Sequence, residues 1–172
     1  MEVSIVSDFC LKIKGKQGSI IVDPRKSLRG KVESDAILIF DKREKYDDTK
    51  VEGYRVIING PGEYEISGIK VSASKLGANV IYQLYVDNVD IILAFASSIE
   101  KAKEKLSDHH ILILLMDEKI DFSTLVALEP RIAVMYGEHA QDIAQKDQVT
   151  KSSKLTTTEE KLPEKMETIL LQ

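Results

Sequence analysis

The sequence predicts a single α/β (α+β) domain in which two mixed β-sheets pack as a sandwich flanked by helices. In the first half of its 172 residues, short apolar runs with strand-like alternation dominate, and in the second half strands alternate with helices. Two runs, 37–40 and 111–116, are continuously apolar, which is typical of strands buried on both faces. Such strands need covering layers, and no linker or internal repeat divides residues 1–172.

Turn signals separate the strands of the first half. The clearest is Asn59-Gly-Pro-Gly62, because proline fixes φ and glycine accepts positive φ; Gly60, Pro61, Gly62 and Glu63 are therefore expected to form a structural turn. Ser67-Gly68 and Asp87-Asn88 each join two strands into a hairpin. The expected strands are residues 2–6, 9–13, 19–22, 37–40, 54–58, 63–66, 69–72, 80–86 and 89–93.

The second half begins with a helix signal. Ser97-Ser-Ile-Glu100 reads as a capping box, and Ile99, Ala102 and Leu106 would share one helix face. Residues 146–160 are polar and are expected to form an exposed loop, with room for a short strand around Leu155. The remaining expected elements are strands 111–116, 131–136 and 166–171, a helix over 121–128 capped by Asp121, and a short helix over 139–145.

Composition narrows the class of protein. Lys and Arg total 24 and Asp and Glu total 28, so a net charge of −4 gives no general attraction to nucleic acid or to an anionic membrane. The apolar runs are too short to span a bilayer, and the N-terminus has no signal-peptide pattern. The single cysteine, Cys10, excludes an internal disulfide and reads as a buried structural residue. We therefore expect a cytoplasmic protein.

Several segments resemble the metallo-β-lactamase fold superfamily, in particular its small branch of proposed zinc-dependent hydrolases. In that branch Gly-His-Ser-Cys-Phe-Lys-Ile stands where this chain has Ser7-Asp-Phe-Cys-Leu-Lys-Ile13, and Thr-Asp-Pro stands at Val22-Asp-Pro24. Asp-Gly-Pro-Gly-Glu-Tyr-Glu stands at Asn59 to Glu65, which is the most specific match. Weaker similarity covers residues 79–82 and 129–132. The resemblance implies a compact four-layer αβ/βα sandwich.

The metal positions that the resemblance implies have been replaced. The His-x-His-x-Asp-His cluster falls on Asp41, Arg43, Lys45 and Tyr46. The next histidine belongs to a loop that here is cut to residues 73–78, and the bridging aspartate and last histidine fall near Ser97 and Gly137. Zinc needs three or four convergent N, S or O ligands, and only Asp41 retains a candidate ligand. We therefore expect no metal or other cofactor.

A rebuilt metal site finds little support in the sequence. His109 and His110 are adjacent on a strand and point to opposite faces, and His139 reads as a helix-start surface residue. Asp8, Asp23 and Asp41 are the carboxylates that a hard divalent cation would need. Asp23 before Pro24 is equally explained as a turn residue, and no nucleophile elbow, phosphate loop or dinucleotide motif is present.

The interpretation that follows is a catalytically inactive metallo-β-lactamase-fold protein that acts by binding, with a protein partner or an active relative of the same fold. Two alternatives remain open: an enzyme with a relocated non-zinc site, and a small-ligand module that uses the former cleft. The remnant cleft is expected to be closed by its own side chains, with Asp41 or Asp23 paired to Arg43. Its candidate residues are Asp8, Asp23, Asp41, Arg43, Tyr46, Ser97 and Gly137.

Overall fold

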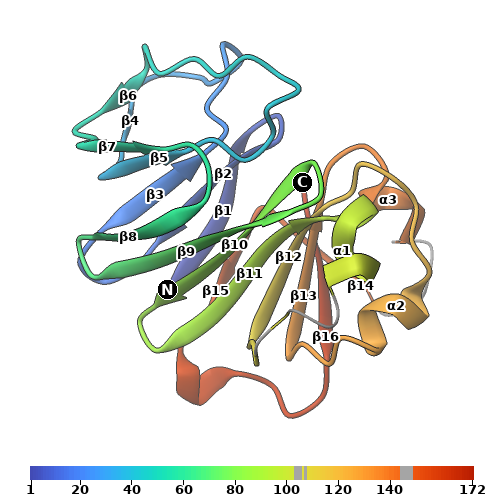
Figure 1. The fold of residues 1–172 in the computed structure, drawn as a ribbon. Helices are drawn as coiled ribbons and strands as arrows, with labels where there is room; N and C mark the ends of the chain where they lie inside the picture. Colours follow the sequence, from blue (N-terminus) through green and yellow to red (C-terminus); the bar gives the residue numbers. More distant parts are fainter. Residues whose placement is uncertain (103–105, 107, 144–148) are drawn as a thin grey trace.

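Two sheets pack face to face in the computed structural model of the chain, which describes residues 1–102, 106, 108–143 and 149–172 (Figure 1). The smaller sheet has six strands in the order β15-β1-β2-β3-β5-β7, and the larger has eight in the order β14-β16-β13-β12-β11-β10-β9-β8. Both are mixed, since each combines antiparallel hairpins with parallel neighbours. The predicted α/β class and two-sheet sandwich are confirmed.

The smaller sheet is formed by β1 (Glu2–Ser7), β2 (Cys10–Lys14), β3 (Ser19–Val22), β5 (Ala36–Leu38), β7 (Val56–Ile58) and β15 (Lys154–Thr156). The larger sheet is formed by β8 (Gly62–Ile66), β9 (Ile69–Leu76), β10 (Asn79–Val86), β11 (Val89–Phe95), β12 (Ile111–Leu115), β13 (Ile132–Tyr136), β14 (Val149–Ser152) and β16 (Glu167–Leu171). The other elements are β4 (Val32–Glu33), β6 (Val51–Glu52), helices α1 (Ala96–Ala102), α2 (Phe122–Val126) and α3 (Ala140–Ile143), and the 3-10 helix η2 (Glu159–Lys161).

Strand alternation places the core. Ile20 and Val22 of β3 face the central core between the sheets, whereas Ile21 faces outward into a second apolar cluster. In β12, Ile111, Ile113 and Leu115 face the central core while its other two residues face the helices. Successive side chains of a strand point to opposite faces, so a continuously apolar strand serves two buried layers.

The two outer layers differ in construction. Helices α1, α2 and α3 pack over part of the larger sheet (Figure 1), through residues such as Ile99, Leu125 and Ile143. The smaller sheet is covered by irregular chain, which contributes Leu28, and by the short parallel pair β4–β6, which contributes Val51. Described residues on this side form no α-helix, unlike the flanking helix expected there. Apolar side chains from irregular chain can bury a sheet face as the apolar side of a helix does, because the hydrophobic effect depends on the apolar area removed from water.

Three expected elements are corrected. Residues 146–160 are not one loop: β14 joins the larger sheet and β15 the smaller, and residues 146–148 lie outside the described residues. Leu155 is the one buried apolar residue among residues 149–160, so these edge strands carry little apolar signal. The expected cut loop at 73–78 is a continuation of the β9–β10 hairpin. The Gly60 turn is confirmed, but Gly62 and Glu63 already belong to β8.

The predicted helices are present with shifted bounds. The first begins at Ala96, and its predicted continuation to Leu106 falls partly outside the described residues. Asp121 precedes α2 as expected, although its side chain makes no capping hydrogen bond. Residues 144–145 of the last predicted helix also lie outside the described part. Among the described helices, none has the length and apolar character needed to cross a membrane.

Candidate functional site

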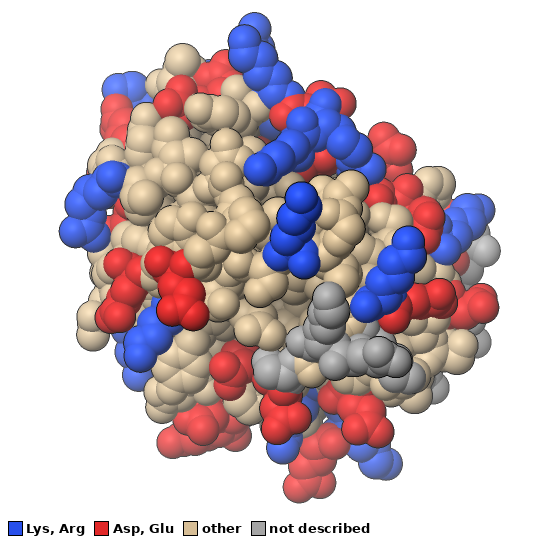
Figure 2. Space-filling model, in the orientation of Figure 1, with Lys and Arg blue, Asp and Glu red and all other residues tan. Residues whose placement is uncertain are grey.

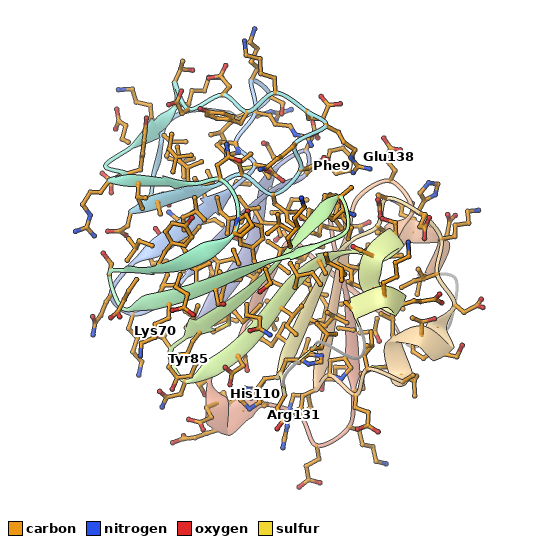
Figure 3. All side chains as sticks on the ribbon, viewed as in Figure 1. Phe9, Lys70, Tyr85, His110, Arg131 and Glu138 are labelled. Carbon is orange, nitrogen blue, oxygen red and sulfur yellow. The ribbon has the colours of Figure 1, made fainter. Side chains whose placement is uncertain are left out.

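A cleft of about 220 Å³ opens where the ends of several parallel strands meet. Asp41 follows β5, Asp117 follows β12 and Glu138 follows β13, so three separate chain segments deliver acidic residues to one edge. Figure 3 places Phe9 and Glu138 together at this end of the sandwich, opposite His110 and Arg131. The lining residues are Phe9, Arg25, Asp41, Arg43, Glu44, Leu115, Met116, Asp117 and Glu138.

Asp23 holds the floor beneath the cleft together. It is 3% exposed and adopts a left-handed conformation with φ of 49°. Its carboxylate accepts hydrogen bonds from the backbone N–H of Phe40 at 2.7 Å and of Asp41 at 3.0 Å. Burial raises the pKa of Asp23 to about 6, with the charge of Asp41 adding to the rise and the backbone hydrogen bonds opposing it. Asp23 therefore holds the backbone at Phe40 and Asp41 in place, and burying its charge costs folding free energy.

Asp23 is expected to make the protein less stable as pH rises from about 4 to 7. The folded-state pKa of about 6 lies above the unfolded value. The contribution of Asp23 to the free energy of unfolding is therefore fully present below the unfolded pKa and is lost as pH rises through the folded pKa. The loss amounts to at most about 3 kcal/mol. The free energy of unfolding, measured with urea at each pH, should depend less on pH in Asp23→Asn, which keeps a carbonyl acceptor. The same pH dependence in the variant and the wild type would contradict the assignment.

Arg43 links the two acidic walls of the cleft. Its Nε donates to Asp41 Oδ1 at 2.8 Å and its Nη2 to Asp41 Oδ2 at 3.1 Å, while Nη1 lies 3.3 Å from Asp117 Oδ2. The guanidinium also stacks over the Phe95 ring, 4.9 Å from its centroid. The expected pairing of Asp41 with Arg43 is confirmed. One planar cation thus joins carboxylates that are far apart in sequence.

Asp41 is the most enclosed charge of the cleft wall, at 5% exposure. Burial alone would raise its pKa, but the hydrogen bonds and charge of Arg43, aided by Arg25 at 3.6 Å, outweigh burial and lower it. Arg25 in turn lies over the ring of Phe9, 5.1 Å from the centroid. Phe9 has φ of 58°, unusual for a bulky residue, and this turns its ring toward the cleft wall.

Ser97 and Gly137 lie beside the cleft. Ser97 donates two hydrogen bonds to Asp117, from its backbone N–H at 3.1 Å and from its hydroxyl at 2.8 Å, and these hold the carboxylate in place. The hydroxyl that was predicted to cap the helix therefore binds Asp117 instead. Gly137 has φ of 106°, and a Cβ there would come within 2.8 Å of Leu115 Cδ1. The chain after β13 therefore needs glycine to turn past the end of β12.

Two expected cleft residues lie elsewhere. Asp8 is exposed on the β1–β2 turn, and its neighbour Phe9 forms the wall in its place. Tyr46 is 37% exposed and lines a separate surface groove with Lys45 and Asp47, so it does not fill the cleft floor. Strand alternation beyond residue 40 does not continue, because residues 41–50 form irregular chain.

His110 and His139 lie where the sequence indicates, and His109 stands next to His110 before β12. His110 precedes β12 and accepts a hydrogen bond from the backbone N–H of Asp90 at its Nδ1. His139 precedes α3 and lies 3.2 Å from Asp142. Both are outside the lining of the cleft.

The donor set does not fit a zinc pair. Asp41 and Asp117 are both engaged by Arg43, and Asp23 is engaged by backbone N–H groups. Within the described residues, no three His, Cys, Asp or Glu side chains are grouped so as to share a metal ion. A guanidinium supplies positive charge to the carboxylates but offers no coordination position and activates no water.

Sequence reasoning missed Arg25, Asp117 and Glu138. A signal for Asp117 was available, because it directly follows a buried strand at the edge where sites on parallel sheets form. Arg25 follows Asp23-Pro24 but gives no pattern of its own. The fully buried hydroxyl of Tyr136, which has no hydrogen-bond partner among the described residues, was also missed. Burial raises the pKa of Tyr136 well above the usual value, and the charges of Asp23 and Asp41 add to the rise.

Comparisons with known proteins agree on the fold. The sequence matches no known family profile and no curated protein. Among solved structures, a proposed zinc-dependent hydrolase of the metallo-β-lactamase superfamily from Thermotoga maritima is similar, with a TM-score of 0.73, 13% identity, and coverage of 99% of this chain and 98% of that one. A proposed metal-dependent hydrolase from Parabacteroides distasonis gives a TM-score of 0.51, 18% identity, and coverage of 78% and 80%. The chain therefore has the metallo-β-lactamase fold.

Proposed function

We propose that this chain is a catalytically inactive protein of the metallo-β-lactamase fold that acts by binding. The observation that carries this proposal is the Arg43 guanidinium, which bonds to Asp41 and Asp117 inside the cleft. Metal-dependent hydrolysis needs an open coordination position and a water activated by the ion. A side chain that neutralises the same carboxylates supports the fold without either. The unpaired Cys10 is consistent with a cytoplasmic location, which remains part of this proposal.

A small-ligand module is the second candidate. The cleft retains about 220 Å³, and Glu44 and Glu138 at its mouth are exposed. The alternative of a relocated enzyme centred on Asp8, Asp23, Asp41, Arg43 and Tyr46 has less support, because Asp8 and Tyr46 lie away from the cleft.

Purified protein is expected to contain far less than one zinc per chain, and EDTA is expected to leave its melting temperature unchanged. In a metal-holding relative, ion binding to the native state adds to folding free energy, and chelation removes that contribution. Elemental analysis and thermal unfolding measure the two quantities. The control is the same protein incubated with excess zinc and dialysed. Stoichiometric zinc together with a fall of several degrees in EDTA would overturn the proposal.

A further inference from the structure

Part of the larger sheet carries no covering layer formed by residues that the structure describes. Ile92 of β11 and Leu112 of β12 pack into the helix-side cluster, so the outer face of the sheet is the face on which they lie. Cross-strand partners share a face, and Gln83 of β10 pairs with Ile92 while Ser72 of β9 pairs with Gln83. The outward residues of β8, β9 and β10 therefore lie beyond the helices. Figure 2 views this face, with basic side chains near its middle and acidic side chains toward its left and lower edges.

A row of charged and aromatic side chains crosses this face. Glu65 pairs with Lys70, Lys70 with Tyr85, and Tyr85 with Asp90, so four strands contribute one residue each. Tyr85 is 39% exposed, which is unusual for a large aromatic residue in this chain. Figure 3 places Lys70 and Tyr85 next to each other along this row. Adjacent strands are about 4.8 Å apart, so the backbone positions of the acidic residues at the two ends of the row are about 14 Å apart.

The row borders a groove of about 500 Å³. Its lining includes four carboxylates, from Glu63, Glu65, Asp90 and Asp108, against the single amine of Lys70. Ser72 and Gln83, on the two middle strands, contribute uncharged polar surface between the two acidic ends. The groove therefore carries a net negative charge, with acidic groups at both ends and an aromatic ring along one side.

The charge of the groove selects among possible occupants. Two copies of an acidic face repel each other, which disfavours a symmetric dimer through this face. Nucleic acid and anionic membranes are disfavoured by the same sign of charge. An extended peptide rises about 3.4 Å per residue, so residues four positions apart span about 14 Å, the separation of Glu65 and Asp90.

We infer that this groove binds an extended basic segment of a partner protein, with Lys or Arg at two positions four residues apart. One cationic side chain pairs with Glu65 and Glu63 at the β8 end, and the other pairs with Asp90 and Asp108 at the β11 end. Arg also stacks favourably on an exposed tyrosine such as Tyr85. The inference rests on the proposed binding role and specifies the surface and the chemistry of the partner.

Fluorescence polarisation with a labelled pentapeptide tests the inference. The probe carries arginine at positions one and five, with glycine and serine between, and its matched control carries glutamate at both positions. The wild-type protein should bind the arginine peptide only, and more weakly as salt is raised. The double variant Glu65→Gln with Asp90→Asn should weaken binding about fivefold, since exposed ion pairs contribute modestly. Tyr85→Ala should weaken it independently of salt.

The matched control variant is Glu100→Gln with Glu118→Gln, which removes two exposed carboxylates at the opposite end of β11 and β12. It should bind the arginine peptide as the wild type does. An equal loss in this control, equal binding of the glutamate peptide, or no binding at millimolar protein would overturn the inference. A dimer in sedimentation that dissociates in the Glu65 and Asp90 variant would assign the face to a second copy and overturn it too. None of these results bears on zinc content, so failure of this inference can be distinguished from failure of the proposal that the protein is catalytically inactive.

Discussion

Replacing Tyr82 with alanine is expected to lower the free energy of unfolding by about 3–5 kcal/mol, the range for deleting a buried aromatic ring. Tyr82 is fully buried on β10, and its ring packs edge-on against Phe40, with centroids 6.0 Å apart. Its hydroxyl donates to the carbonyl of Ile39 at 3.1 Å. Because Ile39 and Phe40 lead directly to Asp41, the cavity would open beneath the cleft. Urea unfolding monitored by circular dichroism measures the loss.

Tyr82→Phe separates the ring from the hydroxyl. It keeps the packing against Phe40 and removes one hydrogen bond, so the expected loss is about 1 kcal/mol. A loss in Tyr82→Phe equal to that in Tyr82→Ala would show that the Ile39 hydrogen bond, and not ring packing, fixes this part of the core. A negligible loss in both variants would contradict the burial of the ring.

Replacing Arg43 with alanine is expected to lower the free energy of unfolding by about 1–3 kcal/mol at pH 7. Breaking a buried ion pair costs about 3–5 kcal/mol, and the Arg43 side chain is 58% exposed, so solvent screening reduces this value. Among the described residues, the buried carboxylate of Asp41 would keep the backbone N–H of residue 43 at 3.1 Å and the guanidinium of Arg25 at 3.6 Å. The pKa of Asp41 is lowered in the native protein, so the stability it contributes is present above the unfolded pKa and is lost as pH falls through the folded pKa.

The difference between the wild type and Arg43→Ala should therefore shrink in acid. Arg43→Lys is expected to fall between the two, because an ammonium keeps the charge without the two-pronged contact to Asp41. Lys42→Ala, on the same exposed segment, is the matched control and should change stability by less than about 0.5 kcal/mol. An Arg43→Ala variant as stable as Lys42→Ala would show that the ion pair does not hold the cleft.

The sequence alone determined the two-sheet sandwich. Alternation and continuous apolar runs predicted the strands, because the pattern of apolar residues along a strand indicates which of its faces are buried. The pairing of Asp41 with Arg43 was equally accessible, since the two residues lie two positions apart and carry opposite charges. That Arg and Tyr occupy positions 43 and 46, where the resemblance implies histidine ligands, needed only the identity of the residues.

Only the tertiary structure decided which residues meet in the cleft and which face of the larger sheet is left uncovered. Asp117 and Arg43 are 74 positions apart, and nothing local indicates that their side chains lie within 3.3 Å. Tyr46 was misplaced because irregular chain after residue 41 has no periodicity to fix a side chain's direction. The row from Glu65 to Asp90 depends on the registers of three strand pairs. Such contacts form only when distant segments pack together, so sequence patterns do not encode them locally.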